Sequence, residues 1–168
     1  WPHTHGTPAL PEASVELRLA DGRTVGIALG AVGFRTVELA NGAFEDFALR
    51  WNGERVFCRG AALPPLDARS LHAAPAGYEQ LLALATRSGV NMLRVVGNFV
   101  YESDDFYRAC ERHGVLVFQD FMFANMDYPH DDEDFRRSVE LEARQQLSRL
   151  HSHPCLALLC GNSEQEQQ

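Results

Sequence analysis

The feature of this sequence that most constrains its fold is an alternation of apolar runs and helical segments after residue 45. The apolar runs predict four strands, one ending near residue 62 and the others at residues 90–96, 115–118 and 156–160. Apolar residues occupy these runs almost continuously, which is typical of strands buried on both faces in a parallel sheet covered by helices. The sequence therefore predicts the order β-α-β-α-β-α-β.

Three helices are predicted between these strands. The first ends at Gly89, and the second begins at Ser103 and stops at Gly114. The third opens on the acidic residues 131–134, where the helix dipole favours negative charge, and ends at His153-Pro154. The second helix is expected to bury Phe106 and Cys110. Apolar residues at helical spacing mark one face of the first and third helices: Tyr78, Leu81, Leu82 and Ala85 on the first, and Phe135, Val139, Ala143, Leu147 and Leu150 on the third.

Two architectures fit this alternation, an open doubly wound sheet and a (β/α)8 barrel. A nucleotide-binding doubly wound sheet carries a Gly-rich loop after its first strand, and no such loop is present here. The pattern therefore favours the barrel.

The first 45 residues have a different texture. Alternating apolar and polar residues at 14–19 and 34–39, with turns at Asp21-Gly22 and Asn41-Gly42, predict antiparallel strands. A further hairpin is expected around Trp51-Asn52-Gly53-Glu54. Because about forty residues of this kind are too few for a stable sandwich, we interpret them as the end of a β-sandwich domain.

Charge and composition limit the partners and the redox state that we expect. A net charge of −8 argues against nucleic acid or an anionic membrane as partner, and no apolar run is long enough to span a bilayer. The chain starts with Trp rather than Met, so we expect its natural beginning to lie upstream. The four cysteines lie in apolar runs and are interpreted as buried thiols: Cys58, Cys110, Cys155 and Cys160.

Polar residues gather where the predicted strands end, which is where parallel α/β folds carry their function. Glu164 follows the fourth strand, and burial at a strand end favours a protonated carboxyl that can act as a general acid. Asp120 has the same position on the third strand, and Arg94 on the second is a natural ion-pair partner for a carboxylate near it. This group favours hydrolytic acid/base chemistry over a purely structural role.

Two metal sites are the competing hypotheses. His151, His153, Cys155 and Cys160, together with the His3/His5 pair, are ligand-type residues for zinc, but the cysteines fall in a strand and the His151/His153 pair at a helix end. The acidic run 127–134 lacks the spacing and central glycine of an EF-hand calcium loop. We therefore expect no metal here.

The ordered set of short motifs resembles glycoside hydrolase family 2, and within it the β-mannosidase branch. The resemblance covers essentially the whole chain, and its specificity comes from the order of the motifs rather than from any one of them. The motifs are Trp1-Pro2-His3-Thr4-His5-Gly6, Gly33-Phe34-Arg35, Asn52-Gly53, Arg59-Gly60-Ala61, Asn91-Met92-Leu93-Arg94, Tyr101-Glu102, Asp105-Phe106-Tyr107, residues 119–124, Tyr128-Pro129, His153-Pro154 and Gly161-Asn162-Ser163-Glu164.

The resemblance implies a fold and a division into domains. Residues 1–45 would be the C-terminal part of an immunoglobulin-like β-sandwich domain. Residues 46–168 would be the N-terminal half of a TIM-barrel catalytic domain, namely its first four βα steps. The family's nucleophile is a Glu on a later strand, so we expect this chain to be part of a longer enzyme and to lack that residue.

The resemblance also implies a function, which is retaining, exo-acting hydrolysis of β-mannoside-like O-glycosyl bonds. Glu164 matches the general acid/base, Arg94 the residue beside the nucleophile, and Asp120 a stretch that lines the sugar pocket. Asn162 and Ser163 complete the expected substrate-binding set. The mechanism requires no metal or organic cofactor.

One departure from the family leaves alternatives open. Ser163 stands where the family usually has an Asn that binds the sugar's 2-hydroxyl, and strand geometry directs Asn162 to the opposite side. In addition, the smaller Val96 stands where the family commonly has Trp. The choice of sugar is therefore open between β-mannosidase-like specificity and a β-galactosidase or β-glucuronidase type, and a non-catalytic sugar-binding relative is a further alternative.

Overall fold

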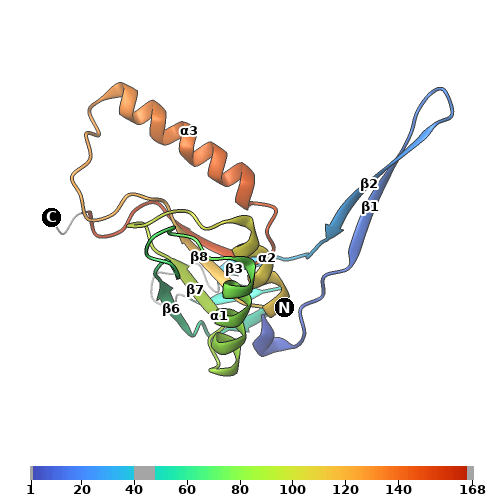
Figure 1. Cartoon of the computed structure of the whole chain (residues 1–168), viewed down its shortest axis with the longest axis horizontal. Coiled ribbons are helices and arrows are strands. Elements are labelled where there is room, and N and C mark those ends of the chain that lie inside the picture. Colours follow the sequence, from blue (N-terminus) through green and yellow to red (C-terminus); the bar gives the residue numbers. More distant parts are fainter. Residues whose placement is uncertain (1, 40–47, 166–168) are drawn as a thin grey trace.

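The computed structural model describes residues 2–39 and 48–165, and the predicted strand–helix alternation is confirmed there (Figure 1). Its centre is a four-stranded parallel sheet in the order β6-β7-β8-β9. The strands of this sheet are β6 Gly60–Leu63, β7 Met92–Val95, β8 Leu116–Asp120 and β9 Leu156–Cys160, and the helices are α1 Pro75–Arg87, α2 Asp104–His113 and α3 Glu133–Leu150.

The helix ends follow local chemistry that the sequence already indicated. Gly114 ends α2 in the left-handed conformation at φ 65°, where a glycine has no side-chain penalty. Asp132 caps α3 by accepting a hydrogen bond from the backbone N–H of Phe135 at 2.9 Å. Ser103 occupies the N-cap position of α2, as predicted, but its side chain makes no capping hydrogen bond.

The two faces of the parallel sheet are covered by different elements. On the outer face, side chains of the strands pack under α1 and α2, and Phe106 and Cys110 are fully buried as predicted. The inner face carries Met92 and Leu116 at the amino end of the sheet. The outer cluster contains Leu63, Tyr78, Leu82, Leu93, Val95, Phe106, Tyr107, Ala109, Cys110, Val115, Val117, Leu150, Cys155 and Leu156.

A three-stranded antiparallel sheet covers the amino end of the inner face. It consists of β3 Val37–Leu39, β4 Leu49–Trp51 and β5 Glu54–Val56. The predicted Asn-Gly hairpin is confirmed, since Asn52 and Gly53 both have positive φ, at 51° and 83°. Leu49, Trp51 and Val56 then pack against Met92 and Leu116, which closes this end of the sheet with apolar contacts.

The β1–β2 hairpin projects away from the rest of the molecule (Figure 1). Its strands, β1 Glu12–Arg18 and β2 Thr24–Ala31, are joined through the predicted turn at Asp21-Gly22. The run 34–39 yields only the short strand β3, and the sequence did not single out β2. The Asn41-Gly42 turn and the expected domain boundary at residue 45 lie outside the described residues.

Helix α3 lies across the top of Figure 1, apart from most of the sheet. The predicted apolar face is only partly covered, because Leu150 is buried whereas Leu147 is 38% exposed and Phe135, Val139 and Ala143 are half-buried. The apolar residues of α3 thus lie on a helix as predicted, but the described residues leave much of this face uncovered. Periodicity identifies an amphipathic helix, but it does not say whether a neighbour covers the apolar side.

Candidate active site

An ion pair between two neighbouring strands lies at the carboxyl end of the parallel sheet. Arg94 on β7 donates from Nε to Oδ1 of Asp120 on β8 at 2.9 Å, and from Nη2 to Oδ2 at 2.8 Å. Asp120 is completely buried, whereas the Arg94 side chain keeps 36% of its surface exposed. The sequence indicated an unspecified nearby carboxylate as the partner of Arg94, and in the structure that carboxylate is Asp120. A bidentate contact of this kind fixes the orientation of the guanidinium as well as its position.

Two further contacts support this pair. The ring of Phe118, which is the register partner of Arg94, lies 5.0 Å from the guanidinium carbon. The backbone N–H of Gly97 donates to Oδ2 of Asp120 at 3.3 Å. A Cβ at Gly97 would lie 2.5 Å from the carbonyl oxygen of Phe121, so this approach requires glycine. The hydrogen bond with Asp120 raises the pKa of Arg94, which keeps the guanidinium charged.

Ser163 is brought to this pair by a short stretch of backbone pairing. Its N–H donates to the carbonyl of Phe123 at 2.9 Å, and its carbonyl accepts from the N–H of Asn125 at 3.2 Å. Arg94 Nη2 then donates to Ser163 Oγ at 3.3 Å. Because this oxygen accepts from the guanidinium, the Ser163 hydroxyl hydrogen is directed to another group, such as a bound ligand.

Glu164 lies beyond the sheet rather than at its edge. Strand β9 ends at Cys160, and Glu164 follows four residues later in the left-handed conformation at φ 58°. Its side chain is exposed, and within the described part of the chain its carboxylate makes no hydrogen bond or ion pair. The expectation that strand-end burial desolvates Glu164 is therefore wrong for these residues, because the intervening loop carries it away from the apolar strand.

Asn162 does not join the Arg94–Asp120 pair. It is exposed, and its side-chain amide donates to Oε1 of Gln165 at 2.7 Å. This agrees with the expectation that Asn162 and Ser163 point to opposite sides. The structure thus brings together Arg94, Asp120 and Ser163, while Asn162 and Glu164 lie beside them on the same loop.

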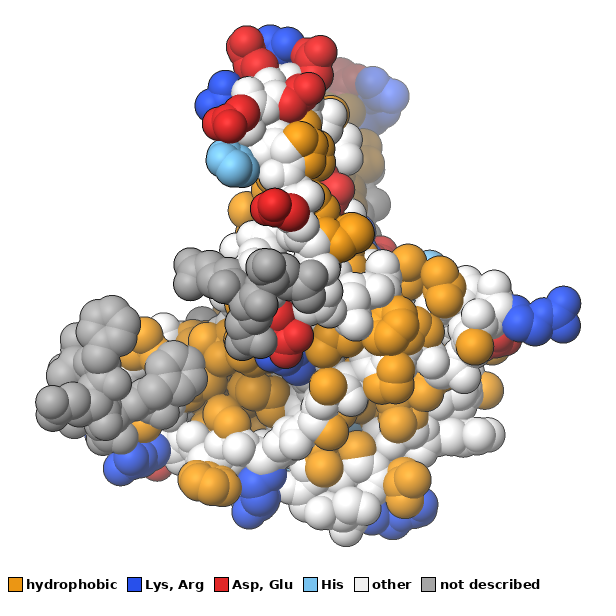
Figure 2. Space-filling view, turned by 90° about the vertical axis from the view of Figure 1, so that its left-hand side faces the viewer, with side chains coloured by type: hydrophobic (Ala, Val, Ile, Leu, Met, Phe, Trp, Pro, Cys, Tyr) orange, Lys and Arg blue, Asp and Glu red, His pale blue; other side chains and the backbone are white. Residues whose placement is uncertain are grey.

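Figure 2 shows this side of the molecule, where the C-terminus lies in Figure 1. Hydrophobic side chains spread over the lower part of the face, whereas acidic and basic side chains gather at the top, over the N-terminal end of α3. The charged group at the top includes the exposed ion pairs of Arg137 with Glu133 and Asp134. Much of this face is therefore apolar surface that the described residues do not cover.

The residues proposed for zinc have other partners. His153 Nδ1 lies 2.5 Å from Oε1 of Glu111, and His151 Nδ1 lies 2.9 Å from the carbonyl of Ser148 at the end of α3. His3 and His5, in a short 3-10 helix His3–His5, contact backbone carbonyls. No group of three or more His, Cys, Asp or Glu side chains suited to a metal ion occurs in residues 2–39 and 48–165.

Two further expectations concerned the burial of the cysteines and the lack of a membrane-spanning segment. All four cysteines are free; Cys110 and Cys155 are buried as predicted, and burial raises the pKa of both thiols. Cys58 is exposed, so its predicted burial is wrong, and Cys160 is only partly covered. None of the helices that the structure describes has the length and apolar character needed to cross a membrane.

Sequence reasoning assigned no role in the site to Gly97 or Phe118, although both hold the Arg94–Asp120 pair. Gln119, a polar residue at the same strand end as Asp120, is buried on the helix-facing side of β8. A glycine directly after an apolar strand was a usable signal, because it permits close backbone approach. The role of Phe118 depends on the register of β7 with β8, which the sequence does not reveal.

Comparisons with known proteins bear on the identity of the chain. A β-mannosidase of Bos taurus is 37% identical over 171 residues, covering 99% of this chain and 19% of the relative. β-Mannosidase B of Aspergillus flavus is 37% identical over 170 residues, covering 99% of this chain and 20% of the relative. The solved β-D-mannosidase of Dictyoglomus thermophilum has a TM-score of 0.73 and 40% identity, over 81% of this chain and 17% of that one.

Over nearly its whole length the chain is therefore similar to β-mannosidases, and it shares its fold with a solved member of glycosyl hydrolase family 2 from Bacteroides cellulosilyticus, with a TM-score of 0.65 at 18% identity over 89% of this chain and 20% of that one. The chain spans about a fifth of the length of the curated relatives it matches. A β-glucuronidase of Parabacteroides merdae shares its fold, with a TM-score of 0.75 at 16% identity over 95% of this chain and 20% of that one. No protein-family model matches the chain.

Proposed function

We propose that this chain is a segment of a retaining, exo-acting β-mannosidase-like enzyme that hydrolyses O-glycosyl bonds. The observation that carries the proposal is the meeting of Arg94, Asp120 and Ser163 at the carboxyl end of a parallel sheet, directly before Glu164. The near-complete alignment with curated β-mannosidases supports the substrate class. We propose a β-linked glycoside as substrate and no nucleic-acid or membrane partner.

Glu164 is the proposed general acid and then general base. As an acid it protonates the glycosidic oxygen of the leaving group, and as a base it later takes a proton from the water that releases the sugar. Its exposed position on a loop after β9 leaves the carboxyl accessible to a substrate. Desolvation of Glu164 would then have to come from the bound substrate and from other parts of the longer protein.

The remaining site residues bind and orient the sugar in this proposal. Arg94 presents a partly exposed cation whose direction is fixed by Asp120, and Ser163 can donate its hydroxyl hydrogen to a sugar oxygen. Because Asp120 is completely buried, we assign it to the sugar site through Arg94. Asn162, exposed on the same loop, is the proposed contact to a more distant part of the substrate.

Retaining hydrolysis needs a second carboxylate about 5–5.5 Å from the first, which attacks the anomeric carbon. We propose that a part of the longer protein outside this chain supplies it, and that Arg94 lies beside it. The mechanism requires only these carboxyl groups and the donors around them, with no metal or organic cofactor.

We further propose that the parallel sheet is half of a (β/α)8 barrel and that residues 1–45 end an immunoglobulin-like domain. Among residues 2–39 and 48–165 no strand pairs with the outer edge of β6 or of β9, which supports the first idea, since a closed barrel leaves no strand edge unpaired. The exposed apolar side chains of the β1–β2 hairpin support the second, since a sandwich covers such a face with another sheet.

The test is Glu164→Gln in the full-length protein that carries this chain. On a β-mannoside with a poor leaving group, kcat should fall by about 10²–10⁴-fold, because the leaving oxygen is no longer protonated. On an activated dinitrophenyl β-mannoside the loss should be much smaller. Glu140→Gln, which removes an exposed ion pair on α3, is the matched control and should leave both rates unchanged.

Two outcomes would contradict the proposal. An equal loss on both substrates would exclude proton donation by Glu164. A wild-type protein that binds mannosides but hydrolyses neither substrate would indicate a non-catalytic sugar-binding relative.

A further inference from the structure

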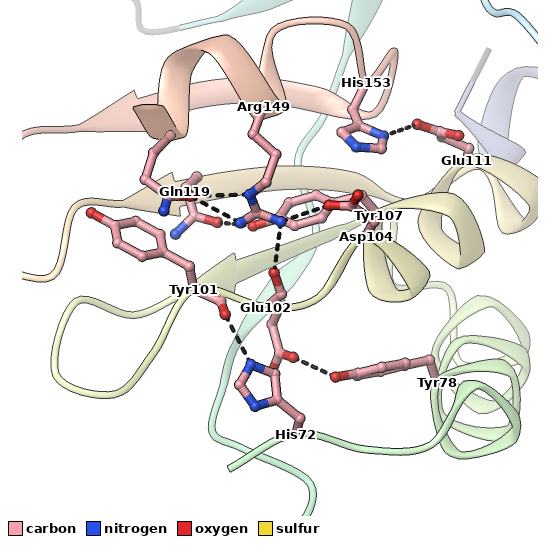
Figure 3. A network of polar contacts seen from close by, with 11 residues as sticks. His72, Tyr78, Tyr101, Glu102, Asp104, Tyr107, Glu111, Gln119, Arg149 and His153 are labelled. Carbon is pink, nitrogen blue, oxygen red and sulfur yellow. Dashed lines mark hydrogen bonds and ion pairs between the residues drawn. The ribbon is translucent and has the colours of Figure 1, made fainter. Parts of the chain in front are cut away.

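A network of buried polar side chains lies behind β8, on the side away from the Arg94–Asp120 pair (Figure 3). It joins β8 to all three helices through hydrogen bonds between residues that are distant in sequence. Buried polar groups of this kind require partners, because each unpaired one costs free energy. The part of the network that contacts β8 is the bond between Tyr107 on α2 and Gln119 on β8.

Gln119 connects α2 to the backbone of Asp120. The Tyr107 hydroxyl donates to Gln119 Oε1 at 2.5 Å, and Gln119 Nε2 donates to the carbonyl oxygen of Asp120 at 2.7 Å. Tyr107 is fully buried and Gln119 is 1% exposed, so no solvent competes for these bonds. The amide can be oriented in only one way, since a flipped Gln119 would direct its oxygen at the Asp120 carbonyl.

Asp120 is the last residue of β8, so its carbonyl lies where the ladder ends. A hydrogen bond to this carbonyl fixes the orientation of the peptide group that links Asp120 to the next residue. The carboxylate of the same residue holds Nε and Nη2 of Arg94. The direction of the Arg94 guanidinium therefore depends on contacts made on both faces of β8.

Tyr107 is itself held firmly by its surroundings. The Arg149 guanidinium of α3 lies 5.4 Å from its ring centroid, and the His153 ring stacks on it at 5.1 Å. Arg149 also donates to Asp104 at 2.7 Å and to the carbonyl of Glu102 at 3.0 Å. Burial raises the pKa of Tyr107, which keeps its hydroxyl protonated and able to donate to Gln119.

We propose that Tyr107 and Gln119 are positioning residues for the sugar site, which set the orientation of Arg94 through the backbone of Asp120. The proposal rests on the proposed function for its effect on catalysis. Neither residue touches the substrate. Each acts by fixing the strand end that carries the Arg94–Asp120 pair, because small displacements of a substrate-positioning group reduce the rate strongly.

The test uses Tyr107→Phe and Gln119→Met in the full-length protein. Each variant removes one hydrogen-bonding group at nearly constant volume. We expect each to lower kcat on a β-mannoside by about 10–100-fold, which is the order of loss for a displacement of about 1 Å. The double variant should lose no more than either single one, because both remove the same connection.

Tyr78→Phe is the matched control. Tyr78 is also fully buried and also donates a short hydrogen bond, at 2.5 Å to Glu102, but among the described residues neither side chain has a hydrogen bond to β8. It should lower the melting temperature at least as much as Tyr107→Phe while leaving kcat unchanged. If Tyr107→Phe and Gln119→Met also lower only the melting temperature, the residues are merely structural and the proposal is overturned.

A second measurement separates this proposal from the proposed function. Hydrogen exchange followed by mass spectrometry reports on the Gly97 amide, which donates to Asp120. Exchange in the peptide that contains Gly97 should be faster in Tyr107→Phe and Gln119→Met than in Tyr78→Phe. That result in a protein without glycosidase activity would support the positioning role and remove the proposed function. Unchanged exchange in a protein with glycosidase activity would support the proposed function and contradict the positioning role of Tyr107 and Gln119.

Discussion

The β1–β2 hairpin and the β7–β8 pair are both hydrogen-bonded ladders, yet they differ completely in what covers them. In the hairpin, the cross-strand neighbours Val15 and Ile27 are 40% and 44% exposed. In the parallel pair, Leu116 is fully buried, and its register partner Met92 is 7% exposed. Hydrogen bonding between strands therefore does not by itself indicate where the stability of this chain resides. Stability depends instead on whether other elements pack over the ladder and bury its side chains.

The energetic difference between the two regions follows from burial. Burying one large apolar side chain contributes about 1.5–3 kcal/mol, and the outer face of the parallel sheet buries many of them. An isolated two-stranded hairpin is only marginally stable in water. We therefore expect mutations in the sheet and its helices to have large effects on stability, and equivalent mutations in the hairpin to have small ones.

The strongest test of this comparison pairs Phe106→Ala in α2 with Leu17→Ala in β1. Phe106 is fully buried, so its truncation should lower the free energy of unfolding by about 4 kcal/mol. Leu17 is 47% exposed, and its truncation should change that free energy by less than about 0.5 kcal/mol. Urea unfolding of the 168-residue chain followed by circular dichroism measures both. Similar losses would mean that the hairpin is covered in solution.

A second test compares an ion pair whose carboxylate is buried with one that is exposed on both sides. Arg94→Met leaves Asp120 buried without its cation and should lower the free energy of unfolding by about 3 kcal/mol. Arg144→Met removes a pair with Glu140 that is exposed on both sides, and should cost less than about 0.5 kcal/mol. The same urea titration measures the free energy of unfolding of both variants. A small effect of Arg94→Met would show that water reaches Asp120.

The smallest expected effect on the stability of this chain comes from a polar substitution in the β1–β2 hairpin. Replacing both Val15 and Ile27 by Thr keeps the β-branched shape but makes the hairpin face polar. In this chain the free energy of unfolding should change by less than about 0.5 kcal/mol, while binding of a hydrophobic dye should fall. In the full-length protein the same change should lower the melting temperature clearly. No such drop would argue against a sandwich around residues 12–31.

Much of the fold was predictable because its signals are local. Gly114 ends a helix where a left-handed residue is required, and Asp132 caps the next helix through its own side chain. Apolar runs located the parallel strands, and the meeting of Arg94 and Asp120 followed from neighbouring strand ends. The burial of α3 was not predictable, since an apolar stripe does not reveal whether a partner is present.

The candidate site was predictable only in part. The sequence identified Arg94, Asp120 and Ser163, and the structure brings them into contact. It did not reveal that a loop carries Glu164 away from β9, because a loop's path is not encoded in residue spacing. Nor did it reveal that Tyr107 holds Gln119, because that contact depends on how α2 packs on β8.

The sequence by itself determined the four parallel strands, the three helices and their ends, and it brought Arg94 and Asp120 to the carboxyl end of the sheet. These properties follow from periodicity, capping and turn chemistry, which act over a few residues. Only the tertiary structure decided that the β7–β8 ladder is buried and the β1–β2 ladder is exposed. It also decided that Asp120 is held from both faces of its strand. Burial and side-chain pairing depend on elements distant in the chain.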